Sequence, residues 1–328
     1  MSVASPNIDR LLAAFRHEKL DRVPNFEILI DSRTCSHILG RPDAGKLWNM
    51  DPSDALEIIQ AVGQDALPCK LRYCLDDASI CSREDMDRVE TRDTAPNVER
   101  LRRYAQVVAG TPVGLCVAIS GPLTTSYMTA GPVSIESFLY MLYDAPDLVA
   151  RLMDHYTEYY LRLIDAIADV PFDFFYIGDD IGGTAGPLVS PAHLDEFWAP
   201  RMERYILAAK ALRKPVLFHC CGNQSLVLPY LARWGVEAVH PIQPVANDIY
   251  AVHAEYGDRL TLVGNIDVAT VLTFGTPEQV AESTREHIAK LSGDAGYVVA
   301  SSHSIIDSVP PENYLAMVRA AHEYGVYA

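Results

Sequence analysis

The chain has 328 residues, of which 49% are hydrophobic, so it is long and apolar enough to bury a large core. Its formal net charge of −16 argues against nucleic acid or an anionic membrane as a partner, and no apolar run reaches the roughly 18 residues of a membrane span. The N-terminus is charged and amphipathic, unlike a signal peptide. Together with the seven cysteines, this favours a reduced, cytoplasmic setting with free or metal-bound thiols.

Short β-branched and aromatic runs alternate along the chain with longer helical patterns. The helical patterns lie at about 7–18, 51–62, 96–109, 134–169, 190–212, 224–234, 246–256, 276–291 and 310–325. The runs that predict strands lie at 22–30, 65–72, 112–120, 172–180, the first half of 214–223, 237–244, 259–268 and 296–304.

Eight strands, nearly all separated by helices, predict an α/β fold of one particular kind. With no dinucleotide-binding glycine fingerprint, the order favours a single (β/α)₈ TIM barrel over 1–328, preceded by an N-terminal helical extension. A doubly wound open sheet is the alternative. No linker divides the sequence, so we expect one domain.

The stretch KPVLFHCCGN, Lys214–Asn223, carries the strongest chemical signal. Adjacent strand residues face opposite ways, so His219 and Cys221 share a side and Cys220 faces away. Zinc prefers nitrogen and sulfur donors, so His-x-Cys at a strand end is a plausible half of a zinc site. The alternative is a core cysteine beside a hydrogen-bonded buried histidine.

Polar residues also follow the other predicted strands, at the rim where such barrels place their chemistry. They are Glu27, Asp31, Tyr127, Tyr176, Asp179, Asp180, His240, Gln243, Asn265, Asp267, Ser301, Ser302 and His303. Their number predicts a pocket, because buried polar groups need partners or a ligand. Each also has a structural interpretation: the aspartates as loop caps, the tyrosines as packing, and His240 as a buried structural residue.

Four segments together resemble the uroporphyrinogen decarboxylase superfamily. They are GDDIGGTAGPLVSPAHLDEFWAPRMERYI, FHCCGN, VGNIDVATVLTFGTPEQV and ASSHSIIDSVPPENYLAMV. The resemblance runs from about residue 110 onward and includes the N-terminal helix with its RVP continuation. It implies a TIM barrel, in agreement with the alternation of strands and helices.

Resemblance to one branch of this superfamily, the true decarboxylases, implies decarboxylation of a tetrapyrrole without a cofactor. That branch uses an arginine-rich N-terminal motif and an aspartate on the next strand, whereas RVPNFEILIDSR has no arginine cluster and DALPCKLR has its only acid at Asp65. A pocket lined by Glu27, Asp179 and Asp180 should also repel a polyanion. His303 and Tyr127 fall near positions that the branch uses, so decarboxylation remains an alternative.

The other branch implies methyl transfer with a corrinoid (cobalamin) carried by a partner protein, and a small-molecule methyl donor or acceptor. Its zinc ligands match His219 and Cys221, and the third position, usually cysteine, falls on His303. A rim acid such as Glu27 is a further candidate ligand. A non-catalytic corrinoid- or tetrapyrrole-binding protein is another alternative, and the oligomeric state, including a homodimer, stays open.

The methyltransferase interpretation assigns roles to the remaining rim residues. The catalytic candidates orient substrate or assist proton transfer: Asp179, Asp180, Glu27 and Tyr127. The substrate-binding candidates are Tyr176, Gln243, Asn265, Asp267 and Ser302.

Overall fold

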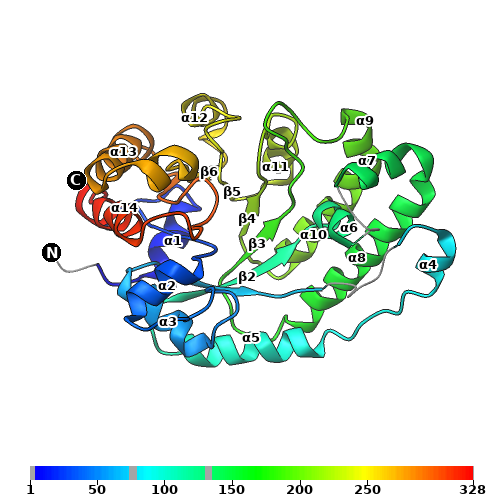
Figure 1. Ribbon diagram of the computed structural model, residues 1–328, viewed down its shortest axis with the longest axis horizontal. Coiled ribbons are helices and arrows are strands. Elements are labelled where there is room, and N and C mark those ends of the chain that lie inside the picture. The colour runs from blue at the N-terminus through cyan, green and yellow to red at the C-terminus, as the bar shows by residue number, and fades with distance from the viewer. Residues whose placement is uncertain (1–3, 74–79, 130–134, 328) are drawn as a thin grey trace.

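The computed structural model describes residues 4–73, 80–129 and 135–327, and within them seven parallel strands pair in chain order. The strands are β1 (Ala66–Lys70), β2 (Gly114–Ser120), β3 (Phe174–Gly178), β4 (Val216–His219), β5 (Ala238–His240), β6 (Thr261–Val263) and β7 (Tyr297–Val298). Parallel neighbours joined by helical crossovers define the predicted TIM-barrel architecture. Figure 1 shows the strands inside and helices such as α5, α8, α13 and α14 outside.

Helices lie in all nine predicted ranges, but 134–169 and 190–212 are each divided, and α2, α4 and α6 were not predicted. The helices are α1 (Ile8–Ala14), α2 (Ser32–Leu39), α3 (Pro52–Ala61), α4 (Arg83–Asp87), α5 (Ala95–Val108), α6 (Pro122–Thr129), α7 (Ile135–Asp144), α8 (Pro146–Ala166), α9 (Pro191–His193), α10 (Ala199–Ala211), α11 (Leu228–Trp234), α12 (Ile249–Tyr256), α13 (Pro277–Leu291) and α14 (Pro311–Tyr324), with π-helical turns η1 (Leu194–Trp198) and η2 (Val268–Leu272). Among the helices described, none is both long and apolar enough to cross a bilayer.

The predicted first strand, 22–30, differs from the expectation. It takes the eighth position of the barrel but pairs with the segment after β7 only through isolated parallel bridges, Asn25 with Val299 and Ile30 with Ile305. Toward β1, the Gln64 side chain replaces much of the backbone ladder: it accepts from Glu27 N and donates to the carbonyls of Glu27 and Ala66. A side-chain amide thus satisfies backbone groups that a regular strand would pair directly.

Two apolar layers hold the barrel. Inward side chains such as Phe26, Phe174 and Leu217 fill its interior, and Phe15 beyond α1 packs edge-on against Phe174, with ring centroids 5.4 Å apart. The outward side chains of the same strands pack beneath the helices. Helix α1 therefore contributes to the same packed interior as the strands, which leaves the opposite rim for polar residues.

Candidate metal centre and cavity

Three side chains with different donor atoms converge at the C-terminal ends of β3 and β4. The ligand atoms of Asp180, His219 and Cys221 all lie within 4.8 Å of one another. His219 Nε2 is 3.3 Å from Asp180 Oδ1 and 3.3 Å from Cys221 Sγ. A carboxylate oxygen, an imidazole nitrogen and a sulfur at these separations offer three ligands to one metal ion.

The backbone of two loops brings these donors together. Gly178, the last residue of β3, lies opposite His219 at the end of β4, so the residues that follow both strands are neighbours. Gly222 adopts φ +73°, and a Cβ on it would lie 2.4 Å from the Gly182 carbonyl oxygen. Only glycine fits this close approach, which sets Cys221 beside Asp180.

The charges in this cluster act in two directions: His219 favours an ionised Asp180, and Asp180 opposes an ionised Cys221. Burial opposes ionisation of Asp180, but the hydrogen bond and charge of His219 outweigh it, and the pKa of Asp180 is lowered. The Cys221 backbone N–H also donates to Asp180 Oδ1, at 2.9 Å. Burial and the Asp180 charge raise the pKa of the Cys221 thiol, so Cys221 is not poised as a free thiolate.

His240 lies directly behind His219, on the neighbouring strand β5. The two residues are register partners, and their Nδ1 atoms are 2.7 Å apart. His240 is 2% exposed, and burial followed by the neighbouring histidines holds its pKa well below the ordinary value. The sequence interpretation of His240 as structural missed this contact, which only the register of two non-adjacent segments reveals.

Asp179, predicted as catalytic, binds the first turn of α6. It accepts from Thr124 N at 2.6 Å, Leu123 N at 3.3 Å and Trp198 Nε1 at 3.0 Å. Burial raises its pKa to about 6. These contacts place Asp179 behind the strand end, at a helix N-terminus, where a carboxylate satisfies otherwise unpaired backbone donors.

Glu27 lies inside the barrel and is 2% exposed. Its two carboxyl oxygens accept from Ser301, one from N at 2.5 Å and one from Oγ at 2.9 Å. Burial raises its pKa to about 8. A buried carboxyl group inside an apolar run needs a hydrogen-bond partner, and for Glu27 that partner is Ser301.

A cavity of about 420 Å³ opens beside the metal-ligand cluster. It is lined by Ile28, Leu29, Trp48, Lys70, Arg72, Tyr73, Ser120, Thr124, Thr125, Met128, Tyr160, Tyr176, Gly178, Asp180, His219, His303 and Ser304. Its walls are mainly apolar and aromatic. Lys70 and Arg72 both lie over the Trp48 ring, 5.3 and 5.7 Å from its centroid.

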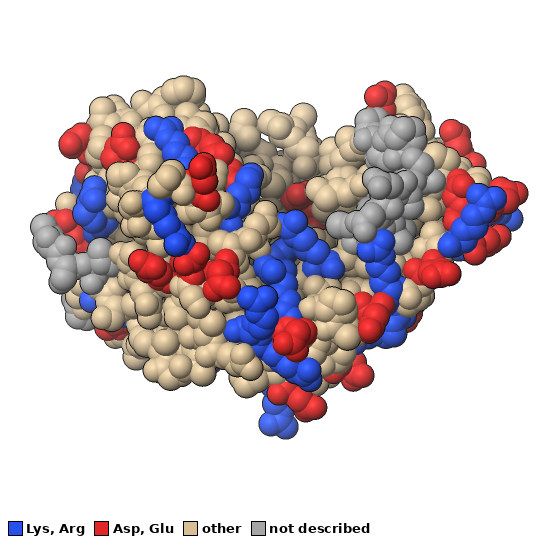
Figure 2. Space-filling model, turned by 60° about the horizontal axis from the view of Figure 1, so that its bottom comes forward, with Lys and Arg blue, Asp and Glu red and all other residues tan. Residues whose placement is uncertain are grey.

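This lining corrects the electrostatic prediction made from sequence. Of the three acids expected in the pocket only Asp180 lines the cavity, because Asp179 turns to α6 and Glu27 turns to Ser301. Two cations, Lys70 and Arg72, line it instead. The sequence could have indicated these cations, because Lys70 and Arg72 follow the apolar core of the predicted strand DALPCKLR. Figure 2 shows that Lys and Arg also gather across the middle of one face, despite the net charge of −16.

The other predicted site residues divide into two groups. Tyr176 and His303 line the cavity, and the centroid of the His303 ring is 6.4 Å from that of His219. The structure thus brings His303 near the cluster, but Asp180 is closer to the two predicted donors. The role of His303 as a ligand stays a prediction.

The second group stabilises loops. Gln243 accepts from Gly222 N at 2.6 Å, and Asn265 contacts His287 at 3.0 Å. Asp267 accepts a hydrogen bond from the start of η2, and Ser302 accepts one from Val268 N. The Tyr127 ring packs edge-on against Phe138. Burial and then Asp180 raise the pKa of Tyr127. These positions hold the rim together, and their substrate contacts stay predictions.

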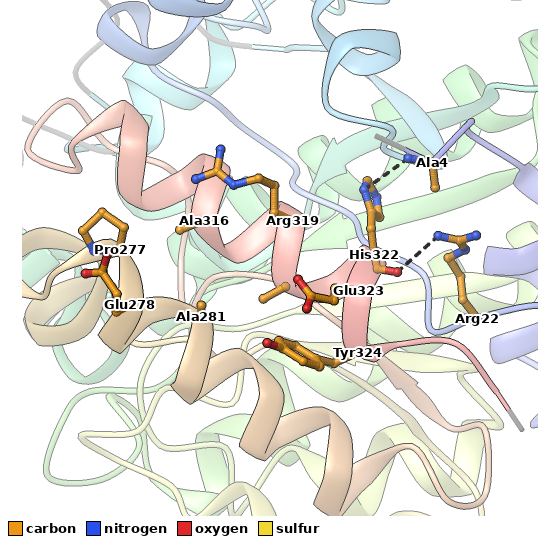
Figure 3. A pocket seen from close by; sticks show the side chains of 11 residues that line it. Ala4, Arg22, Pro277, Glu278, Ala281, Ala316, Arg319, His322, Glu323 and Tyr324 are labelled. Atoms are coloured by element: carbon orange, nitrogen blue, oxygen red, sulfur yellow. Dashed lines mark hydrogen bonds between the residues drawn. The ribbon is translucent and has the colours of Figure 1, made fainter. Parts of the chain in front are cut away.

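A second cavity, of about 470 Å³, runs along α13 and α14 (Figure 3). Arg22 and Arg319 share its lining with Glu278 and Glu323, and His322 accepts from Ala4 N at 3.4 Å. It lies among the outer helices, whereas TIM-barrel chemistry belongs to the C-terminal ends of the strands. The slightly smaller cavity at the rim is therefore the candidate active site.

Comparisons with known proteins agree with the architecture. Residues 52–324 match the uroporphyrinogen decarboxylase (URO-D) family, and the chain belongs to this family. A methyltransferase from Methanosarcina mazei has a similar fold: its TM-score is 0.72 at 21% identity, over 98% of this chain and 99% of that chain.

Similar curated proteins are named as methyltransferases or as uroporphyrinogen decarboxylases. Methylated-thiol–coenzyme M methyltransferase of Methanosarcina mazei is 26% identical over 203 residues, 61% of this chain and 52% of that protein. Methylcobamide:CoM methyltransferase MtbA of the same organism is 24% identical over 247 residues, 75% of this chain and 70% of that protein. Uroporphyrinogen decarboxylase of Coxiella burnetii is 27% identical over 206 residues, 61% and 55% of the two chains. The matched region thus spans about half the length of the first and third of these relatives.

Proposed function

We propose that this chain is a zinc-dependent methyltransferase that exchanges a methyl group between a corrinoid on a partner protein and a small molecule. The observation that carries the proposal is the convergence of Asp180, His219 and Cys221 at the lip of the cavity. Two of the relatives are named as methyltransferases acting with coenzyme M, one of them on methylcobamide. The three ligand atoms and the similarity to named methyltransferases are independent observations, and both support zinc-assisted methyl transfer.

The donor set fits zinc. Catalytic zinc sites have three protein ligands of nitrogen, oxygen or sulfur type and one open position, and here His219, Cys221 and Asp180 supply one donor of each kind. Asp180 and His219 line a cavity of about 420 Å³, so a substrate bound there would lie next to the metal ligands. Zinc held there would lower the pKa of a substrate thiol or hydroxyl, so that its anion exists at neutral pH.

The residues of the cavity have separate tasks in this proposal. Asp180 would hold the metal while it accepts from the Cys221 backbone N–H. Tyr176 and Trp48 would flank the body of the substrate, and Lys70 and Arg72 would attract an anionic group at its other end. A thiol that carries an anionic end suits this division, and the rim around His303 is where the partner's corrinoid would approach.

A methyl-transfer assay tests this function. Methylcobalamin would serve as the donor and coenzyme M or another small thiol as the acceptor, with and without a zinc chelator. We expect loss of methylcobalamin absorbance that depends on thiol and stops on chelation or in His219→Ala. No transfer to any thiol by zinc-loaded protein would contradict the proposal.

A cofactor-free decarboxylase is the second candidate, because Lys70 and Arg72 give the cavity two cations that suit a carboxylate substrate. Uroporphyrinogen decarboxylase is also among the similar proteins. The two candidates differ in one readout. Decarboxylation would survive chelation and the Cys221→Ala substitution, whereas zinc-assisted methyl transfer would not.

A further inference from the structure

We propose that His240 is a positioning residue: it fixes the proton of His219 on Nδ1 and so directs His219 Nε2 at the metal centre. This inference rests on the proposed zinc site and deepens it, because it assigns the group that orients the imidazole ligand. It does not depend on the identity of the substrate or of the partner.

The contact between the two histidines is short and buried. Their ring centroids lie 4.9 Å apart with an interplanar angle of 30°, and the Nδ1 atoms are 2.7 Å apart. Two ring nitrogens at this distance share one proton, so one donates and the other accepts. The ligand atoms around His219 decide which ring is the donor.

The ligand cluster sets this direction. In the proposed site His219 binds the metal through Nε2, the nitrogen that faces Asp180 and Cys221. A neutral imidazole that binds a metal through one nitrogen carries its proton on the other, so His219 Nδ1 is the donor. His240 Nδ1 accepts, and the proton between the rings belongs to His219.

The consequence appears at the far side of the His219 ring. With Nδ1 protonated, Nε2 is the nitrogen available for ligation, and it is the atom 3.3 Å from both Asp180 Oδ1 and Cys221 Sγ. Metal-bound histidines usually donate their second N–H to a carboxylate, a carbonyl or water, and such partners orient the ring. Here a second histidine fills that role.

The contact between the two histidines joins neighbouring strands of the barrel. His240 ends β5 and is the register partner of His219 at the end of β4. Both side chains are at most 8% exposed. Two packed strands therefore set the position of one ligand.

Two variants and one control test the positioning role. His240→Leu removes the acceptor, whereas His240→Asn keeps an oxygen near the place of Nδ1. We expect His240→Leu to weaken Co²⁺ binding, followed by its visible absorption, by about 10- to 100-fold, and His240→Asn to restore most of it. His287→Leu, which removes a histidine bonded to Asn265 and the Ser283 carbonyl, should leave Co²⁺ affinity unchanged.

Imidazole ¹⁵N spectra of the zinc-loaded wild-type protein give a readout that needs no variant to fold. The proposal predicts a proton on Nδ1 of His219 and on Nε2 of His240. A proton on Nδ1 of His240, or equal Co²⁺ affinity in wild type and His240→Leu, would overturn the positioning role alone. Absence of Co²⁺ and Zn²⁺ binding by the wild type would instead overturn the proposed zinc-dependent function.

Discussion

Replacing Glu27 by glutamine separates the cost of burying a charge from the packing of the side chain. Glu27 is 2% exposed, and its carboxyl oxygens accept from the backbone N–H and the hydroxyl of Ser301. Burial raises its pKa from 4.5 to about 8. Glutamine keeps nearly the same shape and can bond Ser301 through its oxygen and its amide, but it does not ionise.

The raised pKa fixes the sign of the effect. The folded protein holds the Glu27 proton more tightly than the unfolded chain, so stability from this group is fully present below pH 4.5 and is lost as pH rises toward about 8. At about 1.4 kcal/mol for each unit of pKa, the wild type should lose up to about 5 kcal/mol relative to Glu27→Gln across this window.

Urea unfolding at about pH 5, 7 and 9, followed by circular dichroism, measures this difference. The free energies of unfolding of wild type and Glu27→Gln should diverge as pH rises, with the variant the more stable at high pH. Glu203→Gln, at an exposed position on α10, controls for the loss of a surface charge. Parallel stability curves for wild type and Glu27→Gln would refute the assignment of a protonated, buried Glu27.

Three further substitutions test separate parts of the account. Asp179→Ala leaves three buried N–H donors without their acceptor. It should lower the free energy of unfolding by at least about 3 kcal/mol in urea titrations. Gly222→Ala should lower both the melting temperature and metal affinity because its Cβ meets a carbonyl 2.4 Å away, whereas Gly186→Ala, with nothing within 4 Å, should change neither. Arg72→Ala should raise KM for an anionic thiol several-fold and leave a neutral thiol unaffected; Arg103→Ala, at an exposed ion pair, is its control. An unchanged KM would remove the cationic wall from the proposal.

The repeating architecture could be predicted from the sequence because it depends on local patterns. Short apolar runs such as 112–120 and well-capped helices such as 276–291 were recognisable, and the structure has β2 and α13 there. The segment 22–30 could not be placed as accurately, since its closure depends on Gln64, a side chain about 40 residues away that replaces backbone pairing.

The candidate site was predicted only where residues two positions apart on a strand share a face. His219 and Cys221 follow from strand alternation, and the structure places their donor atoms 3.3 Å apart. The separate roles of Asp179 and Asp180 could not be assigned, because adjacent carboxylates point to different partners, one to α6 and the other to His219. The contact with His240 depends on inter-strand register, which a single sequence does not determine.

The adjacent cysteines offer the most direct test of the metal centre. Cys221 Sγ lies beside His219, whereas the buried Cys220 sulfur accepts from Ile181 N at 3.4 Å, away from the cluster. The measurement is the zinc content of wild type, Cys221→Ala and Cys220→Ala purified without chelator. We predict stoichiometric zinc in wild type and Cys220→Ala and its loss in Cys221→Ala. A zinc-free wild type, or equal zinc in the two variants, would contradict the account.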